Sequence, residues 1–251
     1  MLPTRNWRTA AGVILMLFAL GGCATSGVTT PSQNDPFESV NRSILEFNLE
    51  SDRVLLKPVA SAYARWIPGP VRTGVNNFFS NLWEPMTIVN DLLQGKLGHA
   101  GRDTARFVIN STLGFFGILD VASELDLPRR REDFGQTLAV WGVPSGPYLV
   151  LPFLGPSNMR DTAGLIPQYM YGDIVLYLDS PEVYYAAATR LVDTRSLLLG
   201  TDDILDLQPD KYLFLREAYR QQRRSQIYDG NPPVEEAIPS DDALIDQLLE
   251  D

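Results

Sequence analysis

The chain has 251 residues, of which 45% are hydrophobic and 21% charged, and it carries a formal net charge of −10. This negative charge disfavours a nucleic-acid-binding protein, because contacts to phosphates require clusters of Lys and Arg. With one Cys and one His, the chain also lacks the set of side chains that a zinc site needs.

The first 22 residues have the features of an export signal. Two arginines precede an uncharged run over residues 9–22, and its apolar core, residues 13–20, is far shorter than the about 20 residues that cross a bilayer. The run ends in Leu-Gly-Gly-Cys, and Cys23 is the only cysteine of the chain. This ending is similar to a bacterial lipobox; an ordinary secretory signal followed by a free thiol is the alternative.

The lipobox resemblance implies that Cys23 is acylated and becomes the first residue of a membrane-bound mature chain. At about 0.8 kcal/mol per buried methylene, one acyl chain anchors marginally, whereas two or three anchor stably. Ala24 and Thr25 follow the cysteine, where an Asp would favour the inner membrane. The resemblance therefore implies the outer membrane, on the side that faces the periplasm.

Composition divides the rest of the chain into three regions. Residues 23–34 are rich in Ser, Thr, Gly, Gln and Pro, which is typical of a flexible tether. Residues 35–228 are long enough for one domain with a single core. Residues 229–251 hold eight acids and no Lys or Arg, so we predict a mostly disordered acidic tail.

The domain is predicted to be mainly α-helical. Asp-Pro-Phe-Glu at residues 35–38 is a strong helix start, and we expect that helix to end at Pro58. A second helix, residues 71–83, has the clearest apolar face, formed by Val71, Val75, Phe78, Phe79, Leu82 and Trp83. Further helices are expected over residues 85–93, 100–112, 162–178, 181–199 and 209–228.

The polar face of the helix over residues 71–83 is almost uncharged. It carries Asn76, Asn77 and Asn81, whereas a solvated face usually carries Lys and Glu, which form helices better than Asn. The three asparagines are therefore candidates for the lining of an enclosed polar channel. A cluster that only caps the helix or faces solvent is the alternative.

Two stretches without charged residues interrupt the helical pattern. Residues 134–159 contain four glycines and four prolines, which excludes a simple membrane-spanning helix and favours an apolar hairpin. Gly142, Gly146 and Pro147 are the candidate hinge of this hairpin. Residues 107–119 form the second stretch, which is also too short to span a bilayer.

Such stretches contact lipid or are buried in a core. Together with several amphipathic helices, they suit a protein that lies within one membrane leaflet or at its surface. A compact soluble domain could use the same helices as its core.

Nothing in the sequence indicates an enzyme, a cofactor or a metal. The one histidine, His99, is predicted to be a solvated residue in a turn, and a Ser-His-Asp site would have to use it. Ser145 follows Gly142 one place too late for a nucleophile elbow. No phosphate-binding or dinucleotide glycine pattern is present.

Twelve short motifs follow one another across residues 23–228. They are Asp35-Pro36-Phe37-Glu38, Asn41-Arg42, Asn76-Asn77-Phe78, Glu84-Pro85, Leu93-Gln94-Gly95, Arg106-Phe107, Asn110-Ser111-Thr112-Leu113-Gly114, Asp120-Val121-Ala122, Phe134-Gly135-Gln136-Thr137-Leu138, Gly146-Pro147-Tyr148, Leu151-Pro152 and Arg160-Asp161. In their order and spacing, these motifs resemble the MlaA (VacJ) family of outer-membrane lipoproteins.

The resemblance implies a ring-like bundle of amphipathic helices in the inner leaflet of the outer membrane, around a polar channel and associated with a porin trimer. Phospholipids misplaced in the outer leaflet would pass through this channel to the periplasmic carrier MlaC. Their removal would maintain the lipid asymmetry of the outer membrane. The alternative is an envelope scaffold lipoprotein without transport activity, which would share the anchor and need no channel.

Cys23→Ala should release the protein from the membrane fraction, because the acyl chains supply most of the anchoring free energy. Cell fractionation and immunoblotting measure the share that remains membrane-bound. Quantitative retention of the unacylated variant in outer membranes would show that the helical domain, rather than the lipid, is the anchor.

Overall fold

The computed structural model describes residues 35–172 and 174–233. Cys23, the predicted tether and the acidic tail beyond residue 233 lie outside the described residues. The described helices and strands are α2 (Glu38–Ser51), a π-helical turn (Asp52–Leu56), α3 (Lys57–Trp66), α4 (Gly69–Leu93), α5 (Leu97–Thr112), α6 (Val121–Glu124), α7 (Phe134–Val140), β1 (Tyr148–Leu151), β2 (Gly155–Asn158), α8 (Met159–Pro167), a second π-helical turn (Gln168–Gly172), a 3-10 turn (Ile174–Tyr177), α9 (Glu182–Leu197), another 3-10 turn (Leu199–Thr201), α10 (Asp202–Asp206) and α11 (Lys211–Ile227).

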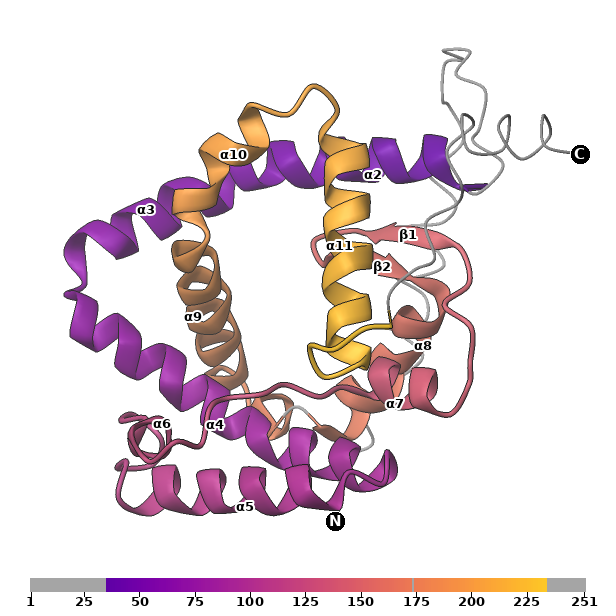
Figure 1. Cartoon of the computed structure of the whole chain (residues 1–251). Coiled ribbons are helices and arrows are strands. Elements are labelled where there is room, and N and C mark those ends of the chain that lie inside the picture. The colour runs from indigo at the N-terminus through magenta and orange to yellow at the C-terminus, as the bar shows by residue number, and fades with distance from the viewer. Residues whose placement is uncertain (1–34, 173, 234–251) are drawn as a thin grey trace, which may run out of the picture.

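The ribbon forms a ring. Figure 1 shows α2, α9 and α11 along three sides of a central opening, and residues 125–133, which we call the strap, cross below it. Helices α3 and α4 form the outer wall beside α9, and α5 runs along α4. The two-stranded antiparallel sheet and α7 and α8 lie on the far side of α11 from the opening. The mainly α-helical, ring-like prediction is confirmed.

The first helical stretch continues beyond its predicted end. We expected it to stop at Pro58, but the chain stays helical from α2 to the end of α3. The π-helical turn Asp52–Leu56 lies directly before this proline, which occupies the first turn of α3. A proline is tolerated at that place, because its missing N–H is one that a helix start leaves unbonded.

Helix α4 is also longer than predicted, because it runs through Pro85 without a break. Side chains on both sides of this proline are held by neighbouring elements. Glu84 pairs with Arg106 of α5, and Asn90 accepts a 2.7 Å hydrogen bond from Thr137 of α7. Tertiary contacts thus override a helix-breaking signal that costs roughly 3 kcal/mol in isolation.

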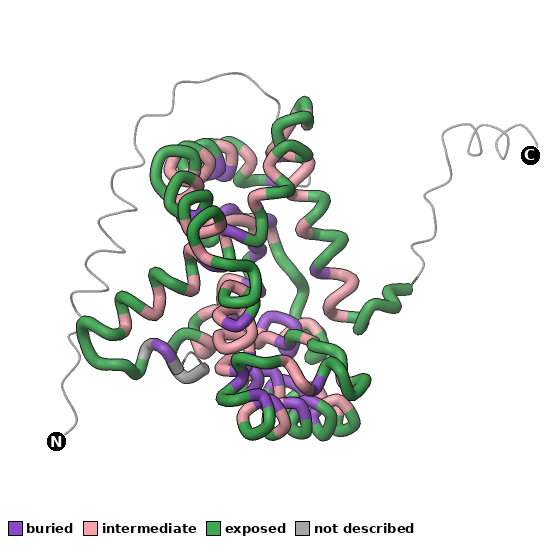
Figure 2. The backbone as a smooth tube through the Cα atoms, turned by 90° about the vertical axis from the view of Figure 1, so that its left-hand side faces the viewer, coloured by how far each residue is buried: buried purple, intermediate pink, exposed green. Residues whose placement is uncertain are grey.

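The interior of the ring protein is unusually polar. Among the described residues, eight hydrophobic and twenty polar or charged residues are buried, and the apolar cluster is limited to Leu45, Tyr148, Val150 and Tyr212 with their neighbours. Figure 2 shows the buried residues concentrated where α4 and α5 pack, whereas much of the remaining chain is exposed. The polar face of α4 is turned inward and Val71, on its predicted apolar face, is 53% exposed.

The apolar hairpin lies later in the chain than predicted. We expected the hairpin to bend at the candidate hinge of Gly142, Gly146 and Pro147, but β1 pairs with β2 around a turn at residues 152–154. Residues 141–147 only lead into β1. The sequence showed many glycines and prolines, but it did not show which of them would form the turn, and the turn includes Phe153 at a φ of +61°.

Helix α2 supplies the missing hydrogen-bond partners of the outer edge of β1. The Asn41 amide donates to the Tyr148 carbonyl and accepts from the Val150 N–H, both at 2.9 Å. Asn48, two turns later, donates to the Leu151 carbonyl and accepts from the Phe153 N–H. An open strand edge otherwise leaves backbone groups unpaired, so these two side chains act as a substitute strand.

Asn41→Ala should destabilise the protein by about 2 to 5 kcal/mol, because it leaves one N–H and one carbonyl unpaired in a buried place. Asn48→Ala is the matched control. It removes the same two bonds near the more exposed end of the strand, so we expect a smaller loss. Thermal or denaturant unfolding in detergent micelles gives both values, and an equal or larger loss for Asn48→Ala would contradict the role given to Asn41.

Candidate functional site

Four arginines connect elements that adjoin around the ring, and we call them the corner arginines. Each guanidinium bonds to carboxylates of other helices or of the residues that flank them, at nitrogen–oxygen distances between 2.6 and 3.0 Å. The pairs are Arg42 with Asp210, Arg195 with Asp52 and Asp202, Arg106 with Glu84 and Asp120, and Arg223 with Asp133 and Asp161. A planar guanidinium fixes orientation as well as distance, so these pairs define how the helices meet.

Arg106 is the most buried of the four, with 1% exposure, and it holds α4, α5 and the start of α6 together. It bonds to Glu84, to both oxygens of Asp120 and to the Leu127 carbonyl at the start of the strap. Burial alone would raise the pKa of Asp120, but hydrogen bonds from Arg106, Ser123 and Asn110 lower it to about 2. Burial raises the pKa of Glu84 to about 7, against the hydrogen bond from Arg106.

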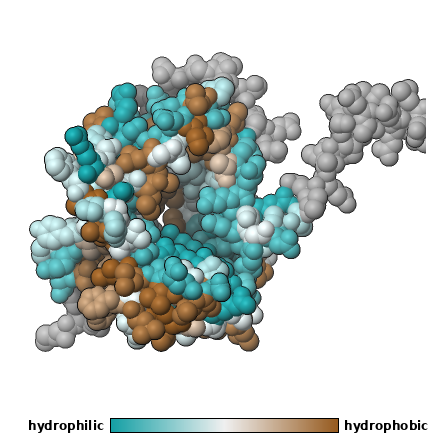
Figure 3. Space-filling view, turned by 60° about the vertical axis from the view of Figure 1, so that its left-hand side comes forward, coloured by the Kyte–Doolittle hydropathy of each residue, from teal (hydrophilic) through white to brown (hydrophobic). Residues whose placement is uncertain are grey.

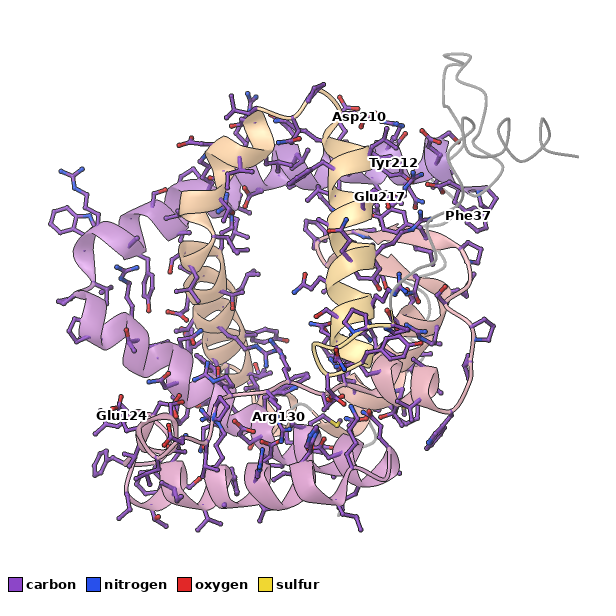
Figure 4. The ribbon with its side chains drawn as sticks, in the orientation of Figure 1. Phe37, Glu124, Arg130, Asp210, Tyr212 and Glu217 are labelled. Carbon is purple, nitrogen blue, oxygen red and sulfur yellow. The ribbon has the colours of Figure 1, made fainter. Side chains whose placement is uncertain are left out.

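At the start of α11, a second set of bonds closes the ring between its first and last described helices. The fully buried Asp35 accepts bonds from the Tyr212 hydroxyl at 2.6 Å and from Arg216 at 2.9 Å. Asp210 and Tyr212 lie at the end of α11 next to α2 (Figure 4). The two ends of the domain are therefore fastened to each other.

Asn76 and Asn77 lie where α4 passes the strap. Both amide oxygens accept hydrogen bonds from Arg129 of the strap, at 3.2 and 2.9 Å. The amide nitrogen of Asn77 donates to the Ile118 carbonyl. Both asparagines remain partly exposed, so they combine a structural contact with a surface that water or a ligand can reach.

Asn81 is in a different environment from the other two asparagines. It is 5% exposed, its amide nitrogen donates to the Ser111 hydroxyl, and a Cβ added to Gly117 would lie 2.4 Å from its side chain. Gly117 also has a φ of +86°, which side chains rarely adopt. Asn81 therefore packs against the turn after α5 and does not reach an open surface.

Helix α11 has one face that neighbouring elements hold and an opposite face that they do not. Tyr212, Tyr219 and Arg223 share the first face and contact α2, α8 and α7. By helical periodicity, the opposite face holds Phe214, Ala218 and Gln221, of which Ala218 and Gln221 are exposed. In Figure 1, α11 lies beside the opening.

Helix α9 provides a more apolar wall across the opening. Its buried Asp193 accepts bonds from Tyr63 of α3 and Asn76 of α4, so this side faces the outer wall. The opposite side holds Tyr184 and Leu191, which are 67% and 53% exposed. Helix α9 therefore turns apolar side chains away from α3 and α4, whereas the exposed face of α11 carries both apolar and polar side chains.

The strap adds positive charge below the opening, where Figure 4 labels Arg130. The Arg131 guanidinium stacks over the Trp83 ring at 4.8 Å, and no ion pair of Arg131 occurs within the described part of the chain. Neighbouring protein atoms partly desolvate the Arg131 guanidinium and lower its pKa, and the Asp133 carboxylate opposes this shift. The side chain still reaches solvent. Partial desolvation together with solvent access is expected for a cation at the wall of a recess.

The outer surface is hydrophobic around much of the ring, and we call this surface the apolar collar. It comprises Val54, Leu55 and Trp66 of the α3 region, Val108, Leu113, Phe115 and Phe116 of α5 and the following turn, and Val140, Trp141 and Val143 after α7, all at least 39% exposed. Figure 3 shows hydrophobic side chains gathered along the lower edge of one face, below a hollow near its centre. None of the described helices is long and apolar enough to cross a membrane.

The three candidate hinge residues lie between α7 and β1. Gly142 and Gly146 have φ angles of +87° and +66°, in the left-handed region that favours glycine. A Cβ on Gly146 would lie 2.9 Å from Met159, whereas one on Gly142 would meet nothing within 4 Å. The Pro147 carbonyl accepts a bond from the Met159 N–H, which extends the pairing of β1 with β2 by one residue pair. Movement of this segment as a hinge stays a prediction.

A cleft with a volume of about 600 Å³ lies between α2 and the α10–α11 region. Its charged walls include the corner pairs of Arg42 and Arg195. Within the described ranges, no group of three or more His, Cys, Asp or Glu side chains is placed to hold a metal ion. His99 lies in α5, and its Nδ1 is 4.0 Å from carboxylates of Asp91 and Asp229.

The corner arginines were not recognised as a group from the sequence. Arg42, Arg106 and Asp120 appeared only as letters of family motifs, and Arg223 lies in an ordinary charged helix. A usable signal was the isolated Arg106 within a run that is otherwise apolar or uncharged. A lone charge in such a place is costly unless it is paired, which predicts a buried partner without naming it.

Comparisons with known proteins agree with this geometry. A family model described as "MlaA lipoprotein" matches residues 33–226. Two proteins named "Intermembrane phospholipid transport system lipoprotein MlaA" are similar to the chain. The one from Escherichia coli (strain K12) is 35% identical over 91% of this chain and 92% of its own length. The one from Haemophilus influenzae is 31% identical over 97% and 98%.

A solved structure described as "Structural basis for maintenance of bacterial outer membrane lipid asymmetry" is also similar. It is 34% identical in sequence and superposes with a TM-score of 0.69. The match covers 79% of this chain and 100% of that chain.

The buried Glu84 should make the stability of the protein depend on pH. Its folded pKa of about 7 lies above the ordinary value of 4.5, so the folded state binds this proton more tightly and stability falls as pH rises through that window. Between pH 5.5 and 8, the wild type should lose about 1 to 3 kcal/mol more than Glu84→Gln, which carries no proton to lose. Denaturant unfolding at both pH values tests this, and equal losses in the two proteins would contradict it.

Proposed function

Because the chain belongs to the MlaA lipoprotein family, we propose that it is a lipid-anchored component of a phospholipid transport system of the outer membrane. In this proposal it removes phospholipids misplaced in the outer leaflet, passes them through the ring and delivers them to a periplasmic carrier. The net result is the maintenance of outer-membrane lipid asymmetry. The observation that carries the proposal is the distribution of residues in the ring, where the interior is polar and the outer surface is hydrophobic.

The apolar collar supports a position within one leaflet. Hydrophobic side chains of this size rarely lie together on the surface of a soluble monomer, because each is stabilised by about 25 cal/mol per Å² when it leaves water. Leu113, Phe115 and Phe116 are 67–69% exposed in a single turn. Lipid tails would cover them, and acylation at Cys23 would keep the ring at the membrane surface.

The two walls of the opening match the two parts of a phospholipid. Asn76, Asn77 and Gln221 offer uncharged hydrogen-bonding groups to a polar headgroup, and Arg131 offers a cation to its phosphate. Tyr184 and Leu191 of α9 offer an apolar surface on the other side. Asn81 has no part in this path, because it is buried against Gly117.

The transport step itself would be passive. A headgroup that leaves water loses hydrogen bonds, and the polar wall replaces them, which lowers the barrier to passage. In this proposal a porin trimer holds the ring in the membrane, and the periplasmic carrier MlaC receives the lipid and supplies the direction. A scaffold lipoprotein would need none of these wall residues, and it would not retain phospholipid on purification.

Ala218→Trp should obstruct the opening and slow lipid passage by about tenfold or more, equivalent to roughly 1.4 kcal/mol on the barrier. Cells that carry the variant should accumulate phospholipid in the outer leaflet and become sensitive to detergent at an unchanged protein level. Ala105→Trp is the matched control, because Ala105 is an exposed alanine of α5 that lies away from the opening.

Normal surface lipid in cells with Ala218→Trp would exclude the opening as the path. An equal defect with Ala105→Trp would show a general effect of the added indole rather than obstruction. In either case, phospholipid that copurifies with the wild-type protein would still separate a lipid-handling protein from a scaffold.

A further inference from the structure

A second cleft lies outside the ring opening, between the C-terminal half of α11 and the segment that leads into and out of the β-hairpin. Its volume is about 370 Å³, at the lower end of the range for small-ligand sites. It is lined by Ser145, Gly146, Tyr148, Asn158, Arg160, Tyr219, Arg220, Arg223, Arg224 and Ile227. The lining therefore includes four arginines and no Asp or Glu.

Arg160 and Arg220 of this cleft are held in place by bonds that leave some of their donors available. Arg160 is 7% exposed, and its Nε donates to Asp161 at 2.9 Å. No bond from its two terminal nitrogens to a described residue is seen, although a guanidinium has five N–H groups. Arg223 is fixed by Asp133 and Asp161, and Arg220 meets Glu217 at 3.3 Å on the surface.

Tyr148 gives a second, independent indication of a ligand. It lines the cleft and is 3% exposed, and its hydroxyl has no hydrogen-bond partner among the described residues. A buried hydroxyl without a partner is unfavourable, so it is usually satisfied by something that the protein binds. An acceptor-rich anion would satisfy both this donor and the terminal nitrogens of Arg160.

We propose that this cleft binds a phosphate group, with Arg160 and Arg220 as ligands and the Tyr148 hydroxyl as an additional donor. Guanidinium groups bind phosphate oxygens in pairs, which distinguishes such a site from a general positive patch. The phosphate belongs either to a phospholipid headgroup or to a small soluble phosphate ester. The site is separate from the ring opening and does not depend on lipid passage through it.

Gly146 is part of the same site. A side chain at this position would meet Met159, at a backbone φ of +66° that most residues avoid. The glycine that the sequence suggested as a hinge therefore also lines the cleft, at a position where a larger residue is strained.

The test uses the full chain in non-ionic detergent micelles and isothermal titration calorimetry with three probes. These are inorganic phosphate, glycerol 3-phosphate and dihexanoyl phosphatidylglycerol. Arg220→Gln and Tyr148→Phe should each raise the dissociation constant about tenfold or more, because each removes a bond to a charged acceptor. Arg102→Gln, at an exposed arginine of α5, is the control and should bind like the wild type.

The melting temperature separates binding from folding. Arg220 makes only a surface ion pair and the Tyr148 hydroxyl has no partner to lose, so neither substitution should lower it appreciably. Binding of all three probes would assign the site to the phosphate group itself, and binding of the lipid alone would assign it to a headgroup. Failure of all three probes to bind, or wild-type affinity in both variants, would overturn the proposal.

Discussion

The ring is closed by guanidinium groups that each bridge separate elements, from Arg42 at the start of α2 to Arg223 near the end of α11. A ring that is one helix thick along most of its circumference cannot bury an apolar core, and only a small cluster around Tyr148 and Tyr212 does so. The connections that a core usually makes therefore fall to ion pairs. Removal of one partner costs roughly 3 to 5 kcal/mol where the pair is buried, as between Arg106 and Glu84, because the other charge stays behind unpaired. The pair of Arg42 and Asp210 is about one-third exposed and contributes less. The shape of the opening thus depends on these pairs.

The same constraint explains why the surface is apolar. Hydrophobic residues that cannot turn toward a core lie on the outside, as Trp66 and Phe116 do at 75% and 69% exposure. In water this arrangement would be unfavourable, whereas within a leaflet it becomes the contact with lipid tails. In the proposed function, polar groups such as Gln221 would face a headgroup that passes through the opening. The proposed membrane position and lipid handling then both depend on how the ring is closed.

The sequence predicted the family and the secondary-structure class better than the contacts between helices. The family, the helical class and the charge-free stretches could be read from local patterns, because those patterns reflect short-range periodicity and motifs. Pro58 was taken as the end of one helix and Pro85 as the start of another, but the chain is helical through both. At Pro85, tertiary contacts such as Glu84 to Arg106 hold the helix together. The partners of Arg106 and Asn41 could not be derived from one sequence, because they lie up to 109 residues away. For the same reason Asn81 looked like Asn77, although one packs against Gly117 and the other reaches the surface.

The most direct test measures which side of the ring faces lipid. Spin labels at Phe116, Val54 and Gln221, attached through single cysteine substitutions in the acylated protein, report collisions with oxygen and with a water-soluble nickel complex in phospholipid bilayers. The account predicts that Phe116 and Val54 collide mainly with oxygen, which concentrates in the hydrocarbon, and that Gln221 collides with nickel. Nickel access at Phe116 and Val54 equal to that at Gln221 would contradict it, because the apolar collar would then lie in water.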